Sequence, residues 1–121
     1  MNRHERRRQQ KKSKLNQTVN RDLLEGIQLH LKKEYQKAEV LYNKVLATEP
    51  SNYEALRHLG ILNQDLKKYE KAYNLFLKAI KVNPSGFQAL SNLATIHMHN
   101  KNYRLAHKCL TKSFSIKSSY I

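Results

Sequence analysis

The 121 residues are enough for one domain, and a domain of this size buries only about two thirds of its unfolded surface. Just three Gly and two Pro residues interrupt a sequence rich in Leu, Lys and Ala, so we expect an all-α fold rather than a sheet. The net charge is +14, no apolar run reaches the roughly 18 residues of a membrane span, and no hydrophobic stretch follows the basic start as a secretion signal requires. We therefore expect a cytoplasmic protein without a transmembrane segment.

The first segment, residues 1–18, is rich in charge, Gln, Ser and Asn and has almost no apolar residue before Leu15. It cannot bury enough surface to offset the entropy of ordering, so we expect a flexible or partly helical tail that extends the first helix. Its basic residues, opposed only by Glu5, are Arg3, Arg6, Arg7, Arg8, Lys11, Lys12 and Lys14. Such a tail attracts anions, and one hypothesis is an accessory protein that binds a polyanion, RNA or the ribosome, through it.

After the tail, apolar residues recur three or four positions apart, which is the spacing of amphipathic helices. Polar breaks near residues 32–34, 67–68 and 100–102 divide these segments into pairs. Turns containing Pro50 and Pro84 separate the pairs, because Pro cannot continue a helix and the neighbouring Ser or Asn can cap the next one. The helices predicted in this way are 20–32, 35–47, 53–66, 69–82, 87–99 and 103–116.

The pairs are copies of a 34-residue repeat. Residues 60–84 are a spaced copy of residues 26–50, and a looser third copy spans residues 94–118. In register they read KEYQKAEVLYNKVL from Lys33, KKYEKAYNLFLKAI from Lys67 and KNYRLAHKCLTKSF from Lys101. We therefore predict three units, 19–52, 53–86 and 87–120, in which lysines at equal positions form columns on the outer surface and in the turns between helices.

The repeat resembles the tetratricopeptide repeat, a 34-residue helix pair with the pattern W-x2-L-G-x2-Y, A-x3-F and P. The matching residues are Gly26, Ala38, Tyr42 and Pro50 in the first unit, Leu59, Gly60, Ala72, Phe76, Ala79 and Pro84 in the second, and Leu93, Ala94, Ala106 and Leu110 in the third. The resemblance covers about residues 19–120. It implies a right-handed α-solenoid of three helix pairs behind a basic N-terminal tail.

The small residues of this pattern have a physical reason. Gly60 and Ala72 let the two helices of a unit approach each other, while Phe76 fills the space between neighbours. Gly in a helix interior costs about 1 kcal/mol relative to Ala. Its presence at Gly26 and Gly60 therefore implies a gain in packing that Ala94 achieves less tightly.

A narrower likeness is to the repeats that precede O-linked N-acetylglucosamine transferase-like domains of the SPINDLY type in bacteria. The run GIQLHLKKEYQKAEVLYNKVLATEPSNYEALRHLGIL is similar to an opening repeat of such proteins, and ALSNLATIH is similar to repeats in which an Asn holds the backbone of a bound peptide. Here Asn92 occupies that position, and Leu24 and His58 are its counterparts. The likeness implies an alternative, a substrate-presenting segment of a glycosyltransferase-like enzyme whose catalytic domain is missing from these residues.

Helical-repeat solenoids usually bind along the concave side, which the first helix of each pair forms. The residues predicted to face inward are Leu23, Ile27, His30, Arg57, His58, Ile61, Gln64, Ser91, Asn92, Thr95 and Met98. The main hypothesis is a non-catalytic scaffold whose partner is a protein or peptide, held by its backbone at Asn92 and by Arg57; the alternative is a solvated face that binds nothing tightly. The family's clamp for acidic chaperone termini is disfavoured, because Leu23 and Ile27 replace its polar residues.

Both ends of the array depart from the pattern. In the first unit Asp22 and Glu25 occupy expected apolar positions, and the apolar stripe is formed instead by Leu23, Leu24, Ile27 and Leu31. The tail, a partner helix or its own second helix could cover this stripe, or the stripe could line the groove. At the other end we expect an uncapped face that carries Cys109, Leu110, Phe114 and Ile116, so that the chain either derives from a longer design or forms a homodimer through this face.

The sequence contains no convincing catalytic or metal site. Of its six histidines, no two have the four-residue spacing of a helical zinc pair, and His97 and His99 point to different sides of a helix. There is no Gly-rich phosphate loop, nucleophile elbow or carboxylate pair in an apolar setting. We therefore expect neither enzymatic activity, nor a metal, nor a cofactor.

Overall fold

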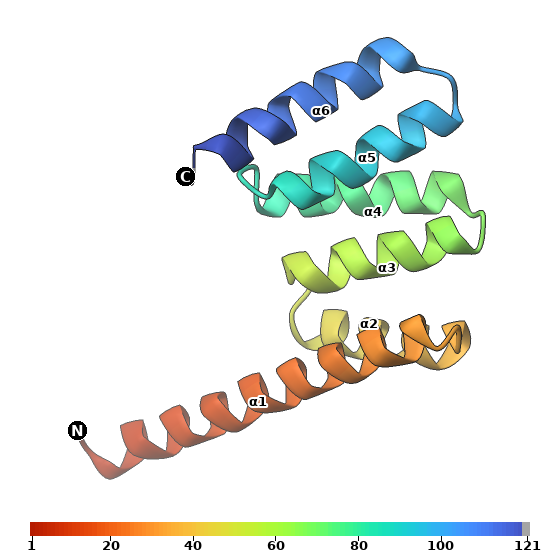
Figure 1. Ribbon diagram of the computed structural model, residues 1–121. Helices are drawn as coiled ribbons and strands as arrows, with labels where there is room; N and C mark the ends of the chain where they lie inside the picture. The colour runs from red at the N-terminus through yellow and green to blue at the C-terminus, as the bar shows by residue number, and fades with distance from the viewer. Residues whose placement is uncertain (120–121) are drawn as a thin grey trace.

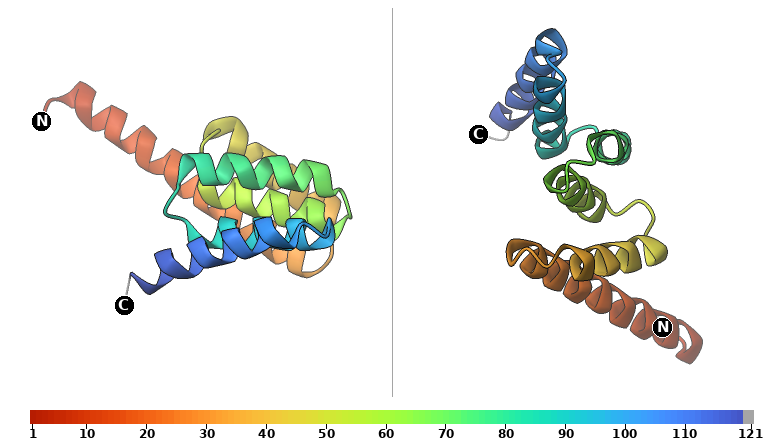
Figure 2. Two further views of the ribbon diagram at one scale, coloured as in Figure 1. Left: turned by 90° about the horizontal axis from the view of Figure 1, so that it is seen from above. Right: turned by 90° about the vertical axis from the view of Figure 1, so that its right-hand side faces the viewer.

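The computed structural model describes residues 1–119, which form α-helices and turns and contain no strand (Figure 1). The described helices are α1 (Arg3–Leu31), α2 (Tyr35–Thr48), α3 (Tyr53–Asp65), α4 (Tyr69–Val82), α5 (Phe87–His99) and α6 (Tyr103–Ser118). Each odd-numbered helix packs against the helix that follows it, and the three pairs stack one on the next (Figure 2). The predicted all-α solenoid of three helix pairs is confirmed.

The two helices of each pair are joined by the same turn. After α3, the backbone N–H of Lys67 donates to the Gln64 carbonyl at 2.9 Å and that of Lys68 to the Asn63 carbonyl at 2.8 Å, which is a Schellman arrangement. Lys67 has a φ of 63°, in the left-handed region that Gly normally occupies at this position. Lys33 and Lys101 repeat this conformation, with φ values of 63° and 62°.

The two turns between units cap their helices differently. Asn52 caps α3 with its own side chain, because its Oδ1 accepts a hydrogen bond from the Ala55 backbone N–H at 2.9 Å. The equivalent residue at the start of α5 is Gly86, which has no side chain to accept one. The hydroxyl of Tyr53, from the preceding unit, accepts from the Ala89 backbone N–H at 3.1 Å instead. A Cβ at Gly86 would collide with this hydroxyl, so the missing side chain makes room for the substitute cap.

The core of each of the first two units is an aromatic ring packed on a glycine. A Cβ added at Gly60 would lie 2.5 Å from Cε1 of Phe76, and one at Gly26 would lie 2.9 Å from Cε1 of Tyr42. Both rings are completely buried. In the third unit the glycine is replaced by Ala94 and the ring by the smaller side chain of Leu110, so the pair changes together.

The tail is helical from Arg3 onward and continues into α1 without a break. The helix begins with a capping box: the Glu5 backbone N–H donates to Oδ1 of Asn2 at 2.8 Å, and the Asn2 backbone N–H donates to Oε2 of Glu5 at 3.4 Å. Arg, Lys and Gln, which dominate the tail, are good helix formers. The sequence-based start near residue 20 coincides instead with the first buried side chain, Val19.

The apolar stripe of α1 divides into a packed half and an exposed half. Leu23 and Ile27 pack against the buried cluster around Tyr42 and are partly covered. Leu24 and Leu31 remain exposed, at 61% and 79%. Asp22, at an otherwise apolar position, is buried, and its carboxylate is paired with Lys44 at 3.3 Å, which compensates part of its loss of water.

The C-terminal face keeps exposed apolar side chains. Phe114 is 73% exposed and Leu110 is 44% exposed, whereas Cys109 and Ile116 are partly covered. Burial raises the pKa of the Cys109 thiol, in spite of Lys108 and Lys112 nearby. The predicted end of the third unit at residue 120 lies outside the described residues. Within residues 1–119, the structure has no helix with the length and apolar character needed to cross a membrane.

Candidate peptide-binding groove

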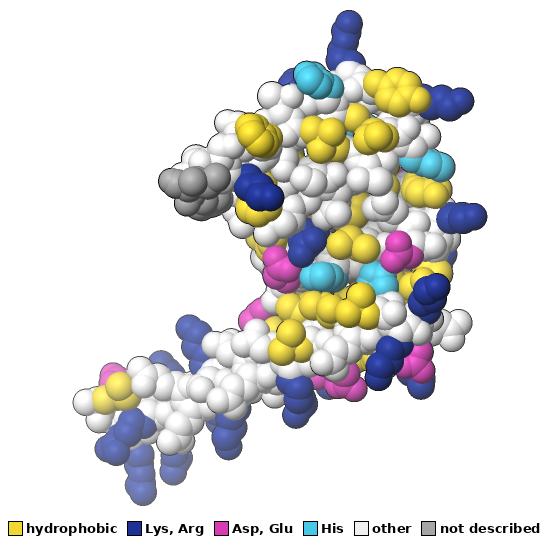
Figure 3. All heavy atoms as spheres, in the orientation of Figure 1, with side chains coloured by type: hydrophobic (Ala, Val, Ile, Leu, Met, Phe, Trp, Pro, Cys, Tyr) yellow, Lys and Arg dark blue, Asp and Glu magenta, His cyan; other side chains and the backbone are white. Residues whose placement is uncertain are grey.

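The eleven residues predicted to face inward lie on α1, α3 and α5, the first helices of the three pairs. The middle helix α3 contacts both α1 and α5, so the three helices form one continuous surface, called the groove below. Figure 3 shows His side chains beside acidic side chains in the middle of the molecule, with a row of hydrophobic side chains over the C-terminal half of α1. The groove is therefore mixed in character and is not a uniformly charged surface.

His30 is held between two partners where α1 meets α3. Its Nε2 lies 2.7 Å from Oδ2 of Asp65, and its Nδ1 lies 3.3 Å from the hydroxyl of Tyr42. A carboxylate can only accept, so the Nε2–H of His30 donates to Asp65, and in the neutral ring Nδ1 accepts from the Tyr42 hydroxyl. Burial raises the pKa of Tyr42 to about 12, so this hydroxyl keeps its proton.

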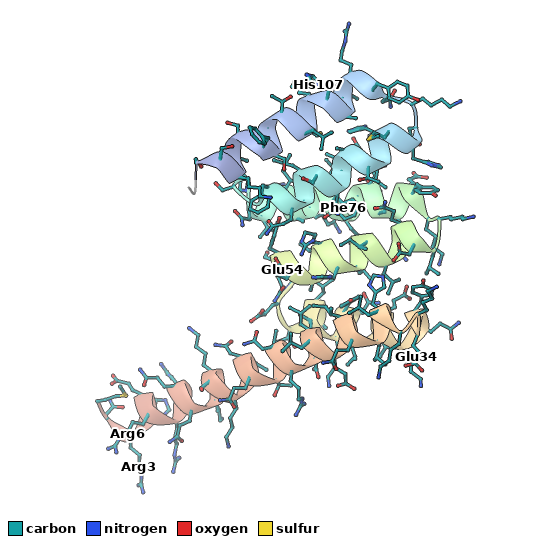
Figure 4. The ribbon with its side chains drawn as sticks, in the orientation of Figure 1. Arg3, Arg6, Glu34, Glu54, Phe76 and His107 are labelled. Carbon is teal, nitrogen blue, oxygen red and sulfur yellow. The ribbon has the colours of Figure 1, made fainter. Side chains whose placement is uncertain are left out.

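Arg57 links the acidic end of α3 to α5. Its Nη2 donates to Oε2 of Glu54 at 3.0 Å, and its Nη1 donates to Oδ1 of Asn92 at 3.5 Å. The Arg57 side chain is only 15% exposed, whereas the carboxylate of Glu54 is partly open to water near the start of α3 (Figure 4). Among the described residues the Asn92 amino group, Nδ2, has no hydrogen-bond partner. Arg57 contacts the carbonyl oxygen of Asn92, so the amino group of Asn92 is available to donate to another acceptor.

His58 stands beside this network. Its Nε2 lies 3.4 Å from Oε2 of Glu54, and its ring stacks on that of Tyr42 with 6.1 Å between centroids. Burial, followed by the positive charge of Arg57, lowers the pKa of His58 more strongly than Glu54 raises it. The ring is therefore neutral at neutral pH.

An open pocket of about 540 Å³ lies between α1 and α3 next to these histidines. Its apolar lining comes from Ile27, Leu31, Tyr35 and Ile61, and its polar lining comes from His30, Lys33, His58 and Asp65. Leu31, one of the apolar lining residues, is 79% exposed. The pocket therefore combines an apolar wall with ionisable groups of both signs.

Three matches to models of the tetratricopeptide repeat cover residues 26–48, 53–85 and 75–108, which together are more than half of the chain. The chain belongs to the tetratricopeptide repeat family. No curated protein matches the sequence.

Several solved structures share the fold, and three of them are tetratricopeptide repeat (TPR) domains. The Sgt2 TPR domain from Aspergillus fumigatus has a TM-score of 0.78 and 25% identity, over 83% of this chain and 66% of that one. The second TPR of Spaghetti (RPAP3), bound to the HSP90 peptide SRMEEVD, has a TM-score of 0.79 and 16% identity, over 88% of this chain and 98% of that one. The TPR2B domain of yeast Sti1, in complex with pHsp70, has a TM-score of 0.80 and 19% identity, over 85% of this chain and 82% of that one. MamA has a TM-score of 0.78 and 17% identity, over 84% of this chain, which spans 60% of the length of MamA.

On the α5 part of the groove, the hydroxyl groups of Ser91 and Thr95 are hydrogen-bonded within the protein. The Ser113 hydroxyl donates to the Phe87 carbonyl at 2.8 Å, so the Ser91 hydroxyl, 2.7 Å away, donates to Ser113. The Thr95 hydroxyl donates to the Ser91 carbonyl at 3.3 Å. Met98 is half exposed, and Gln64 on α3 is partly covered. Asn92 and Met98 are therefore the α5 positions with free groups.

The repeat pattern did not indicate Asp65, the acidic partner of His30, or the pocket residues Lys33 and Tyr35. Leu31 belongs to the apolar stripe that was predicted as a possible lining of the groove, and Glu54 stands four residues before His58. A signal for such pairs was present in the numbering. His30 with Asp65, Tyr53 with Gln88 and Arg57 with Asn92 are each 35 residues apart, one more than the repeat length. Stacked first helices of this TPR array therefore bring residue i beside residue i+35, a rule that a 34-residue alignment does not reveal.

Across residues 1–119, His, Cys, Asp and Glu side chains nowhere gather in a group of three that could hold an ion. The histidines of the groove are instead engaged with Asp65, Tyr42 and Glu54.

Proposed function

We propose that this TPR protein is a non-catalytic scaffold whose groove binds an extended segment of a protein partner. The observation that carries the proposal is the unpaired Nδ2 of Asn92, whose carbonyl oxygen lies 3.5 Å from Nη1 of Arg57. An amide whose oxygen faces Arg57 presents its N–H groups as donors for a backbone carbonyl of a bound peptide. Backbone recognition of this kind is independent of the peptide's sequence.

The pocket between α1 and α3 supports the same proposal by adding selectivity. Its apolar wall, with Leu31 exposed and Ile27 and Ile61 partly covered, fits an apolar side chain of the bound segment. Lys33 and Asp65 supply one charge of each sign beside the pocket. We infer a segment that is anchored by one apolar side chain and held by its backbone at Asn92.

An acidic chain terminus, as in the HSP90 peptide SRMEEVD bound to Spaghetti, is a poorer fit to this groove. Its one Arg side chain, Arg57, is already neutralised by Glu54 at 3.0 Å. Leu23 and Ile27 line the α1 part with apolar carbon rather than with donors. The balance of charge favours an internal peptide segment over a terminal carboxylate.

The test is affinity capture of partners followed by mass spectrometry, comparing wild type with Asn92→Ala. The matched control is Asn74→Ala, an exposed Asn on α4 outside the groove. Partners that use the groove should fall by about tenfold with Asn92→Ala, and by more with Arg57→Ala added, because a hydrogen bond to the peptide and its desolvated partner are lost. Thermal melts of both variants must match wild type. Equal recovery with Asn92→Ala plus Arg57→Ala and with the control would refute the proposal.

A second candidate is the substrate-presenting segment of a glycosyltransferase-like enzyme. It is supported by Asn92, which stands where the resemblance places a peptide-holding Asn, although Leu24 and His58 occupy the other two positions on α1 and α3. A transferase domain in the same reading frame or in the neighbouring gene would favour this candidate.

A further inference from the structure

The N-terminal half of α1 is a separate surface with no role in the groove. This basic arm, residues 3–17, is helical and every one of its residues is exposed. In Figures 1 and 2 it projects beyond the stacked helix pairs, and Figure 4 places Arg3 and Arg6 near its free end. At 1.5 Å per residue the arm is about 22 Å long, which is about two thirds of a turn of duplex DNA.

The charges of the arm oppose its own helix. Arg3 with Arg7, Arg7 with Lys11 and Arg8 with Lys12 are like charges four residues apart, and they lie near the positive end of the helix dipole. None of the seven Lys and Arg side chains of the arm forms an ion pair within residues 1–119. The single carboxylate, Glu5, takes part in the capping box. A polyanion would remove both repulsions.

The side chains are also sorted around the helix. At about 100° per residue, Gln9, Gln10, Ser13, Asn16 and Gln17 share one sector of about 120°, with Arg6 inside it. Basic side chains flank this sector on both sides: Lys12 and Arg8 on one, beyond the single carboxylate of Glu5, and Arg3, Arg7 and Lys14 on the other. An amide and hydroxyl face between two basic rows matches a groove with base edges at its floor and a phosphate backbone on each wall.

We propose that the basic arm binds double-stranded DNA by lying in the major groove. That groove is about 12 Å wide and admits an α-helix, whose diameter is about 10–12 Å, whereas the major groove of duplex RNA is deep and narrow. The arm contains no Phe, Tyr or Trp on which single-stranded bases could stack, and its one imidazole, His4, lies 3.3 Å from the Arg8 guanidinium. Leu15 is its one apolar side chain, so it has no face to insert into a membrane surface.

The experiment is fluorescence anisotropy of the full chain with one labelled sequence prepared as duplex DNA, duplex RNA and single strand. Duplex DNA should bind most tightly. Replacing Arg3, Arg7, Lys11 and Lys14 by Gln should weaken it at least about tenfold at low salt and reduce the slope of log K against log salt by up to about 3.6. The matched control removes four positive charges from exposed positions on α4 and α6, by Lys71→Gln, Lys78→Gln, Lys108→Gln and Lys112→Gln, and should change affinity less than about twofold.

A neutral variant tests the groove itself. Gln9→Ala, Ser13→Ala and Asn16→Ala together should weaken binding to duplex DNA about threefold or more while leaving the salt slope unchanged, because phosphate contacts remain. Equal losses in the arm and control charge variants would reduce the binding to bulk charge and overturn the proposal. So would equal affinity for duplex RNA or single strands, or a neutral variant that binds like wild type. Peptide capture through Asn92 is independent of every one of these outcomes.

Discussion

Lys33, Lys67 and Lys101 occupy a left-handed backbone conformation at the same place in each unit. An L-residue in this region is strained by about 1–2 kcal/mol, and the Schellman turn compensates by satisfying the carbonyls at the end of the preceding helix. The sequence marked these positions as a polar break between helices. It could not show the positive φ, because Gly is the usual signal for it and Lys carries none.

We predict that Lys67→Gly raises the free energy of unfolding by about 0.5–1 kcal/mol, because Gly adopts a φ of 63° without a clash of Cβ. The neighbouring Lys68 has a φ of −92°, so Lys68→Gly should lower stability through unfolded-state entropy. Urea unfolding monitored by circular dichroism measures both. The strain interpretation fails if the two variants shift in the same direction.

Each helix pair is organised by the contact between a glycine and a ring. We predict that Gly60→Ala destabilises the protein by about 1–3 kcal/mol, because its Cβ would lie 2.5 Å from the buried ring of Phe76. The double variant Gly60→Ala/Phe76→Leu recreates the Ala94 and Leu110 pair of the third unit and should recover part of this loss. Thermal and urea unfolding of the two single variants and the double variant measure the coupling. Additive effects would show that the pair is not a unit.

The helix boundaries of the regular units could be read from the sequence, and α1 could not. The segments 53–66 and 69–82 match α3 and α4 closely, because apolar spacing and Pro84 mark them clearly. For α1 the apolar signal begins only at Val19, while helix formation upstream depends on propensity and on the capping box of Asn2 and Glu5. The capping box is present in the sequence as Asn2-x-x-Glu5, a signal that a search for apolar spacing does not use.

At the scale of the whole molecule, neighbouring units are joined by polar contacts between their first helices. The repeat pattern predicted that Arg57 and Asn92 both face the groove, and in the structure Nη1 of Arg57 lies 3.5 Å from Oδ1 of Asn92. It did not identify Asp65, because this residue is equivalent to Leu31 and therefore looked unrelated to His30. Contacts between units follow the offset of 35, whereas the sequence alignment compares residues 34 apart.

The contact between the first two units should depend on pH. His58 on α3 faces His30 from α1, Tyr42 from α2 and, on its own helix, Glu54 and Arg57; burial and Arg57 place its folded-state pKa below the ordinary 6.5. Below about pH 6.5, His58 is protonated in the unfolded chain but still neutral in the folded chain. Its contribution to stability is therefore fully present above this pH and is lost as pH falls toward the folded-state pKa. We predict a steeper loss from about pH 7.5 to 5 in wild type than in His58→Asn.

Urea unfolding at several pH values measures this difference. The matched control is His107→Asn, which replaces an exposed histidine on α6 and should retain the wild-type slope. A slope that is unchanged in His58→Asn would mean that His58 does not couple the first two units to protonation.

The cap that Tyr53 supplies to α5 makes the order of the units matter. Val19 stands at the Tyr53 position in the first unit and Phe87 in the third, and neither side chain has a hydroxyl. If the units were shuffled so that the third followed the first, the backbone N–H of Ala89 would lose its acceptor and Gly86 could not replace it. The three units look like exchangeable copies, yet the third unit depends on the Tyr53 hydroxyl of the second unit to cap its first helix.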